Sequence, residues 1–401
     1  MAHLHGHLKI SAYLKSIGYL TDLHESALDK DWERYNELYG EKNEESTSII
    51  NKDHPIGGTV MWAAAAGGAG SDMWRVYAGN GRPNVQSKRP NSSSPLQKAL
   101  EYSDLKTAEI TAATLLSNNA DPNPIINGST PALHIAAQRG SVALVEMLIR
   151  LGAEVDRADY RGRTAMQLAA YYGQKNTVTL LENHEEIPRT CRTSRYAYDL
   201  NGEPYQSPDL TKLPIHLQGS LVGSAHRDLP AVKKQISENW KLAHSIATTS
   251  ESAIEAGAHM GRKDMVGFLL ESGAPYSLPT AVFMEDFTTV KKLLGEDPNR
   301  IHERGAHDFG LLWYSVIGNK NLEMAELLIK HGAKVEEQHY LGTTALHWAC
   351  LRGSQKLTEL FIENGANINR VGRKFNPNGS TPLQLTKDEK IKAYLKSKGA
   401  E

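Results

Sequence analysis

The stretch GTTALHWACLRGSQKLTELFIENGANINR, residues 342–370, contains every part of a unit that recurs along this chain. A threonine precedes a short apolar segment, where its hydroxyl can cap a helix. A second segment runs from Gly353 to Gly365, with apolar residues four, seven and eight positions after the first glycine. This spacing places the apolar side chains on one helical face, and a glycine supplies the positive φ at which many helices end. The stretch therefore predicts two helices joined by a tight turn.

Both halves of this unit recur elsewhere. The second helix is expected in GHLKISAYLKSIG (6–18), GSVALVEMLIRLG (140–152), GRKDMVGFLLESG (261–273) and GSQKLTELFIENG (353–365). The first helix is expected in GGTVMWAAAAGG (57–68), STPALHIAAQRG (129–140), GRTAMQLAAYYG (162–173), GTTALHWACLRG (342–353) and GSTPLQLTKDEK (379–390). From Gly332 to Gly365 the period is 33 residues. A single helical pair of this size cannot bury its apolar face alone, so we expect neighbouring units to stack.

These motifs resemble the ankyrin repeat, whose signature is T-P-L-H-x-A-A followed by a second helix and a G-A-D/N turn. The match is specific over 127–184 and 307–401. Weaker copies in the same phase cover 57–86, 92–123 and 251–275, and degenerate copies cover 22–51, 216–250 and 277–305. The resemblance implies an all-α repeat solenoid, an ankyrin-like stack of about 12 helix-turn-helix units with the first and last incomplete.

One segment does not fit the repeat. Residues 184–214 contain four prolines and several arginines and tyrosines, without a helical stripe. We expect an N-terminal block of repeats at 1–184, an irregular loop at 185–215, and a C-terminal block at 216–401 that ends in a cap. A loop of this length is commonly functional or disordered, so a recognition element and a mobile spacer both stay open.

Composition narrows the classes of function. The net charge is −1, and basic and acidic residues are interspersed, which argues against broad binding of nucleic acid or an anionic membrane. The two cysteines, Cys191 and Cys350, cannot form a disulfide framework. The apolar run at 60–70 is too short to span a bilayer, and the N-terminus lacks the pattern of a secretory signal. We expect a soluble, monomeric, cytoplasmic protein without a cofactor.

Three histidines near the start, His3, His5 and His7, suggest zinc at first sight. Ligation would require the three side chains to converge and a fourth ligand to complete the site, and no nearby residue supplies one. Alignment with the other units places His7 at the start of a second helix, so we interpret these residues as turn histidines. No pair of residues in the sequence makes a credible catalytic site, and we expect no enzymatic activity.

A second group of histidines and carboxylates is more suggestive. Residues 301–314 and 336–348 would lie on adjacent units, which stacking brings to about 10 Å from each other. The candidate small-ligand or metal cluster comprises His302, Glu303, His307, Asp308, Trp313, His339 and His347. Against this hypothesis, ankyrin turns are commonly polar, and the resemblance implies a structural role for the histidine of T-P-L-H. A metal or small-ligand site is therefore an alternative rather than the main expectation.

The resemblance also implies where a partner would bind, because finger turns and first helices line the concave face of an ankyrin stack. The residues at those positions are Gln138, Arg139, Tyr160, Arg161, Arg163, Tyr171, Tyr172, His259, Met260, His339, Tyr340, Leu351 and Arg352. Tyrosine and arginine are common in binding hot spots. The leading hypothesis is a non-enzymatic scaffold that binds another protein. A further alternative is a fragment of a larger ankyrin-containing protein, since the sequence begins inside a repeat.

Overall fold

The computed structural model describes most of the chain. The described residues are 23–40, 44–53, 58–84, 93–102, 104–124, 130–159, 161–187, 205, 208–210, 213–249, 251–339, 342–373 and 379–401. His3, His5, His7, Tyr160, Cys191 and Tyr340 lie outside them, so the expectations for these residues stay predictions. Of the loop expected at 185–215, only a few residues are described.

The chain divides into two compact units. The first takes Met1–Arg189, Leu213–Ser220 and Ala247–Ser250, and the second takes Thr190–Lys212, Leu221–Ile246 and Glu251–Glu401. α13 (Ile215–Ala225) is therefore shared between them.

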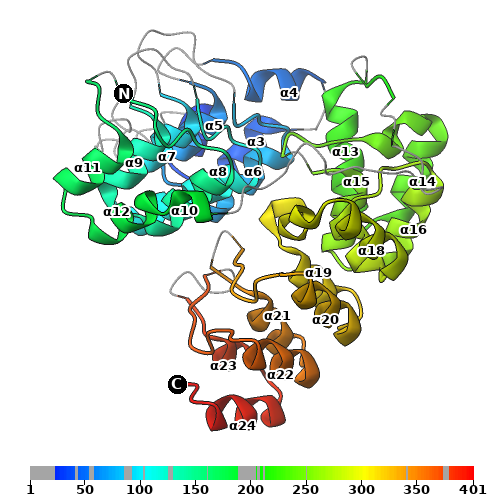
Figure 1. The fold of residues 1–401 in the computed structure, drawn as a ribbon. Coiled ribbons are helices and arrows are strands. Elements are labelled where there is room, and N and C mark those ends of the chain that lie inside the picture. Colours follow the sequence, from blue (N-terminus) through cyan, green and yellow to red (C-terminus); the bar gives the residue numbers. More distant parts are fainter. Residues whose placement is uncertain are drawn as a thin grey trace. The chain divides into compact units, whose positions relative to one another are not determined.

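In the first unit, helices follow one another in pairs along the chain (Figure 1), and from α7 to α12 the second helix of each pair is longer than the first. Its elements are α2 (Leu23–Leu28), α3 (Trp32–Tyr39), α4 (Glu44–Ile50), α5 (Val60–Ala66), η2 (Gly70–Met73), α6 (Trp74–Ala78), α7 (Pro95–Leu100), α8 (Leu105–Ser117), α9 (Ala132–Arg139), α10 (Val142–Arg150), α11 (Ala165–Tyr171), α12 (Lys175–Glu182) and η3 (His184–Glu186). The first helices α5, α7, α9 and α11 each contact the next, and so do the second helices α8, α10 and α12. This is the stacking that the repeat predicts.

The second unit has the same construction. Its elements are α14 (Leu229–Glu238), η4 (Trp240–His244), α15 (Ala253–His259), α16 (Lys263–Glu271), α17 (Leu278–Met284), α18 (Phe287–Glu296), η5 (Pro298–His302), η6 (Ala306–Asp308), α19 (Leu311–Ile317), α20 (Leu322–Lys330), α21 (Ala345–Leu351), α22 (Gln355–Glu363), α23 (Pro382–Leu385) and α24 (Glu389–Ser397). First helices again contact first helices, from α15 through α17, α19 and α21 to α23.

In several first helices, the side chain three positions after the N-cap forms hydrogen bonds that join the helix to the next repeat. Gln97 accepts from the backbone nitrogen of Ser94 at the cap of α7, and its amide donates to the carbonyl of Thr130, 33 residues further on. At the equivalent position, His347 contacts the cap of α21 and the carbonyl of Arg370. One side chain thus completes its own helix cap and bonds to the connection that follows.

Finger turns precede several first helices in the second unit. Isolated antiparallel bridges close them, each between residues six or eight positions apart: Ile246 with Ser252, Arg304 with Gly310, Gln338 with Thr344, and Gly372 with Ser380. The connection between α16 and α17, residues 272–277, is much shorter than the connection 297–310 between α18 and α19. This difference affects the site described below.

Among the described residues, we find no helix with both the length and the apolar character needed to cross a membrane.

Candidate functional site

The residues predicted to contact a partner lie at the ends of first helices and in finger turns, and several are well exposed. Tyr171 and Tyr172, at the end of α11, expose 81% and 48% of their surfaces. Their rings make an edge-to-face pair with centroids 5.1 Å apart. Leu351 ends α21 as Tyr171 ends α11, and Met260 directly follows α15 as Tyr172 follows α11. Both Leu351 and Met260 are exposed. Exposed apolar side chains therefore recur at two adjacent positions where first helices end.

Other residues predicted to bind a partner are occupied in the fold. The guanidinium of Arg139 donates to the carbonyls of Leu100 and Tyr102, which fastens the end of α9 to the end of α7. With Gln138, Arg139 also lines an open pocket of about 480 Å³ between these two helices. Arg139 is therefore held by hydrogen bonds within the fold and forms part of the wall of this pocket.

The finger turn before α11 is held by a buried carboxylate. Asp159 accepts from the side chain of Arg163 at 2.7 Å and from the backbone nitrogens of Arg161 and Arg163. Burial alone would raise the pKa of Asp159, but these hydrogen bonds and the charge of Arg163 lower that pKa to about 2. Arg163 therefore has a structural role in this turn, while Arg161 is exposed.

The histidine and carboxylate cluster predicted at 302–347 does not form a single site. His302 lies 3.5 Å from Glu337, and Glu303 pairs with Arg300 at 2.6 Å. His347 is part of a helix cap, as described above. These residues are held by separate local contacts.

Two more members of that predicted cluster belong to an aromatic stack. The ring of Phe309 stacks on Trp313, with centroids 3.7 Å apart, and on His339, with centroids 4.3 Å apart. The ring of Trp348 contacts Phe309 and Trp313 edge-on. Phe309, Trp313 and His339 are buried, so this stack is core packing between two consecutive repeats of the second unit.

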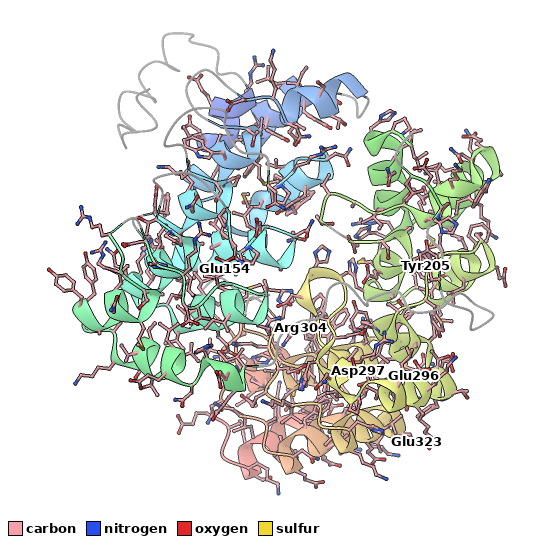
Figure 2. All side chains as sticks on the ribbon, turned by 45° about the horizontal axis from the view of Figure 1, so that its top comes forward. Glu154, Tyr205, Glu296, Asp297, Arg304 and Glu323 are labelled. Atoms are coloured by element: carbon pink, nitrogen blue, oxygen red, sulfur yellow. The ribbon has the colours of Figure 1, made fainter. Side chains whose placement is uncertain are left out.

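Arg304, labelled in Figure 2, anchors the finger turn that carries His307 and Asp308. Its Nη1 donates to the carbonyls of Asp308 and Gln338, each at 3.0 Å. Arg304 is buried and also lies near the carboxylates of Asp308 and Glu337. The turn is therefore fixed both to itself and to the next finger turn.

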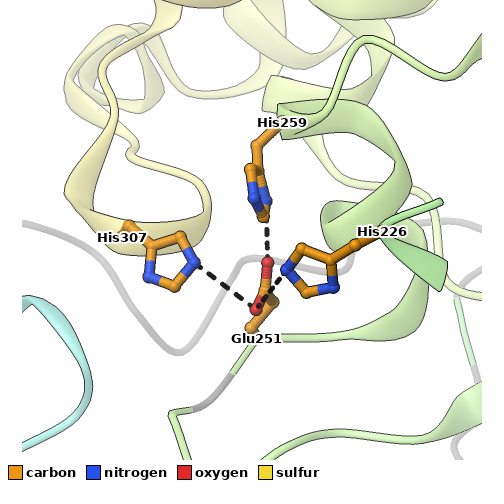
Figure 3. Close-up of side chains that lie close together, drawn as sticks. All are labelled: His226, Glu251, His259 and His307. Carbon is orange, nitrogen blue, oxygen red and sulfur yellow. Dashed lines mark ion pairs between the residues drawn. The ribbon is translucent and has the colours of Figure 1, made fainter. Parts of the chain in front are cut away.

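One concentrated cluster of titratable side chains does occur among the described residues, and it shares only His307 with the predicted one. Figure 3 shows His226, His259 and His307 around the carboxylate of Glu251. Glu251 Oε1 lies 2.8 Å from His259 Nδ1, and Glu251 Oε2 lies 3.7 Å from His226 Nε2 and 3.5 Å from His307 Nε2. The four potential ligand atoms lie within 4.8 Å of one another.

Each residue of this cluster comes from a different part of the second unit. His226 follows α13, and His259 ends α15. Glu251 precedes the cap of α15, and His307 lies at the tip of the finger turn between Arg304 and Gly310. All four residues thus lie at helix ends or in a finger turn, outside the apolar stripes that pack one helix against another.

Burial and charge act in opposite directions on the central carboxyl group. Burial alone would raise the pKa of Glu251, but the nearby His307 and His259 lower it well below its usual range. Burial lowers the pKa of His259, against the opposing effect of Glu251. The pair is therefore an ionised carboxylate beside an imidazole that resists protonation.

Sequence reasoning named His259 as a partner contact and His307 as a ligand candidate but did not join them. It missed His226 and Glu251, which lie in a degenerate copy and directly before a helix cap. Aligning the degenerate units by their helix ends would have placed both residues near His259.

Comparison with known proteins agrees with the helical pairs and their finger turns. A family model described as ankyrin repeats matches residues 60–159, 108–191 and 278–372. The chain belongs to the ankyrin-repeat family. The predicted all-α repeat solenoid is thus confirmed, while the exact number of units stays a prediction.

Relatives of this ankyrin-repeat chain include larger proteins. It is 26% identical to the B-cell lymphoma 3 protein homolog of Mus musculus over 281 residues, which is 68% of this chain and 51% of that protein. It is 22% identical to Rabankyrin-5 of Homo sapiens over 290 residues, 68% of this chain and 22% of that protein. Ankyrin repeat and SOCS box protein 11 of Danio rerio is 38% identical over 90 residues, 22% of this chain and 29% of that protein. The chain spans about half the length of the first relative and less of the others.

Proposed function

We propose that this ankyrin-repeat chain is a non-enzymatic scaffold that binds another protein through its finger turns and the ends of its first helices. The observation that carries the proposal is the recurrence of exposed apolar side chains at two adjacent positions where first helices end. Tyr171 and Leu351 occupy the first of these positions, and Tyr172 and Met260 occupy the second. Ankyrin repeats typically bind other proteins, which supports the same assignment.

The two tyrosines of α11 are the strongest part of this surface. Large exposed aromatic side chains bury much apolar area on binding, and they lose little conformational entropy because they have few rotatable bonds. The ring contact between Tyr171 and Tyr172 restricts both side chains before a partner arrives. Such pre-ordering lowers the entropic cost of binding.

A differential capture experiment tests the proposal. The chain and a double variant, Tyr171→Ser with Tyr172→Ser, are used to capture proteins from the source cell. The matched control is Leu105→Ser, which removes an exposed apolar side chain from the start of α8, a second helix in the same unit. We expect the double variant to lose a protein that the parent chain and the control both retain. Equal recovery with all three chains would contradict the proposed surface.

The proposal also covers the oligomeric state of the chain and the compartment in which it works. We infer a monomer that works in the cytoplasm and binds neither nucleic acid nor membranes, supported by the near-neutral net charge of −1. The buried free thiol of Cys350 is compatible with a reducing compartment. Light scattering coupled to size-exclusion chromatography tests the oligomeric state, and imaging of a tagged chain tests the compartment.

A further inference from the structure

We propose that His226, Glu251, His259 and His307 bind a divalent transition-metal ion, and that Zn²⁺ is the ion this donor set fits best. Three imidazoles and one carboxylate are ligands that zinc accepts in a tetrahedral arrangement. The inference is independent of the proposed scaffold function.

The distances between donor atoms suit such an ion. Zinc bonds to nitrogen and carboxylate oxygen are about 2.0–2.2 Å long, so donors on a zinc tetrahedron lie about 3.4 Å apart. Oε2 of Glu251 lies 3.7 Å from His226 Nε2 and 3.5 Å from His307 Nε2, whereas its other oxygen, Oε1, lies 2.8 Å from His259 Nδ1. With one donor atom taken from each residue, the four atoms lie within 4.8 Å of one another. Small side-chain movements would bring all four donors to bonding distance of one ion.

The hydrogen bond of His226 prepares its inner nitrogen for coordination. Its Nδ1 lies 2.8 Å from the carbonyl of Val222, which can only accept, so Nδ1 carries the proton. Nε2 then presents a lone pair toward Glu251. Such outer contacts fix the tautomer of histidines that bind metals. At His259, the nitrogen that faces Glu251 is Nδ1, and a metal there would displace the proton of that atom.

The charge of the cluster also favours a dication. The ring centroids of His226 and His259 lie 4.9 Å apart, as do those of His259 and His307. A metal ion binds the deprotonated form of each ligand atom, so the bound donor set would carry one negative charge, from Glu251. This charge is complementary to a divalent cation.

The backbone is shaped to deliver His307. The connection 272–277 is too short to form a finger turn like those beside it. η6 therefore reaches past the repeat formed by α17 and α18 and contacts α15. His307 has φ 53°, and Asp308 has φ 66° where the next finger turn has Gly342 at φ 78°. Left-handed conformations are unfavourable for residues with a side chain, so Arg304 and the surrounding contacts must hold this turn.

A metal at this position would act as a structural clamp. It would tie the end of α13, the residue before α15, the end of α15 and the finger turn that carries His307. Four protein ligands fill a tetrahedral coordination sphere, which is typical of structural zinc sites. Binding should therefore raise the melting temperature of the chain.

The test requires a background free of other histidine clusters. We use the full chain with His3→Asn, His5→Asn and His7→Asn, so that the N-terminal histidines make no contribution to the titration. Calorimetric titration with ZnCl₂ should give one ion per chain. His307→Gln and Glu251→Gln should each weaken binding by at least about tenfold, the low end of what even an outer contact contributes to metal affinity.

A matched control comes from His331, whose Nδ1 lies 2.8 Å from the carbonyl of Leu327, the same local bond that His226 makes. His331 is exposed, and the His331→Gln variant should bind zinc like the background chain. Melting of each chain without metal shows whether the variants are folded. The proposal is overturned if the background chain does not bind zinc, if both ligand variants bind as tightly as it does, or if zinc leaves its melting temperature unchanged.

Discussion

Nδ1 of His347 lies 3.1 Å from the backbone nitrogen of Thr344 and accepts its hydrogen at the N-terminus of α21. The other ring nitrogen, Nε2, lies 3.1 Å from the carbonyl of Arg370 and therefore donates. This tautomer is neutral. Protonation of Nδ1 would remove the acceptor from the helix cap and place a charge on a side chain that is completely buried.

The first prediction concerns acid stability. Burial lowers the pKa of His347 to about 4, whereas a histidine in an unfolded chain has a pKa of about 6.5. Between these values the unfolded chain binds more protons, so the free energy of unfolding rises with pH. His347 should contribute about 2 kcal/mol to the loss of stability from pH 7 to pH 5. Urea denaturation at the two pH values measures this.

The control for this prediction is already present in the repeat. Glutamine occupies the equivalent position at Gln97, Gln167 and Gln384 and makes the same cap in each case. A His347→Gln variant should fold and should lose less stability between pH 7 and pH 5 than the parent chain. An unchanged pH dependence would show that His347 does not titrate in this way.

The second prediction concerns the finger turn anchored by Arg304. Arg304→Met should lower the free energy of unfolding by about 3 kcal/mol, because it leaves the carbonyls of Asp308 and Gln338 and nearby carboxylates without their buried cation. Arg262→Met removes a half-buried arginine that pairs with Asp264 and donates to the carbonyl of Arg227, both in contacts open to solvent, and it should have a much smaller effect. Similar effects for the two variants would contradict the anchoring role.

The helical pairs could be predicted because their causes are local. The glycine spacing and the apolar stripe of residues 353–365 correspond to α22, with Leu357 and Phe361 buried. Capping residues such as Thr164 and Thr344 occur where the sequence pattern predicts them. These signals act within one turn or one helix, so a single sequence contains them.

The approach of His307 to the other residues of the proposed metal site could not be predicted in the same way. His226 and His307 are far apart in sequence, and they meet because one connection is too short for a finger and another carries two left-handed residues. The periodicity of the regular units does not encode these exceptions. Likewise, nothing in the spacing of Phe309 and His339 indicates that their rings stack.

The third prediction concerns the thiol of Cys350. Burial raises the pKa of this thiol to about 12, and the thiolate is the reactive form. In a Cys191→Ser background, Cys350 should react with a thiol reagent at pH 8 only after the chain unfolds. The rate of Cys350 labelling should therefore increase as the urea concentration rises. Fast labelling of the native chain would show that α21 opens locally, which its packing does not suggest.

The fourth prediction concerns the last helix, which covers the stack in the second unit. Ile391 and Leu395 of α24 are buried, while Lys396 on the same helix is exposed. α24 contacts both α22 and α23, the helices before it in the stack. Leu395→Ala should lower the free energy of unfolding by about 2–4 kcal/mol, because it leaves a cavity in well-packed apolar surroundings.

Lys396→Ala is the matched control and should change stability by less than about 0.5 kcal/mol. Deleting residues 379–401 should have a larger effect than Leu395→Ala, since it exposes the apolar face of α22 and favours aggregation. Urea denaturation of the point variants and size-exclusion chromatography of the shortened chain measure these effects. A monomeric shortened chain with the parent melting temperature would show that α24 does not stabilise the units before it.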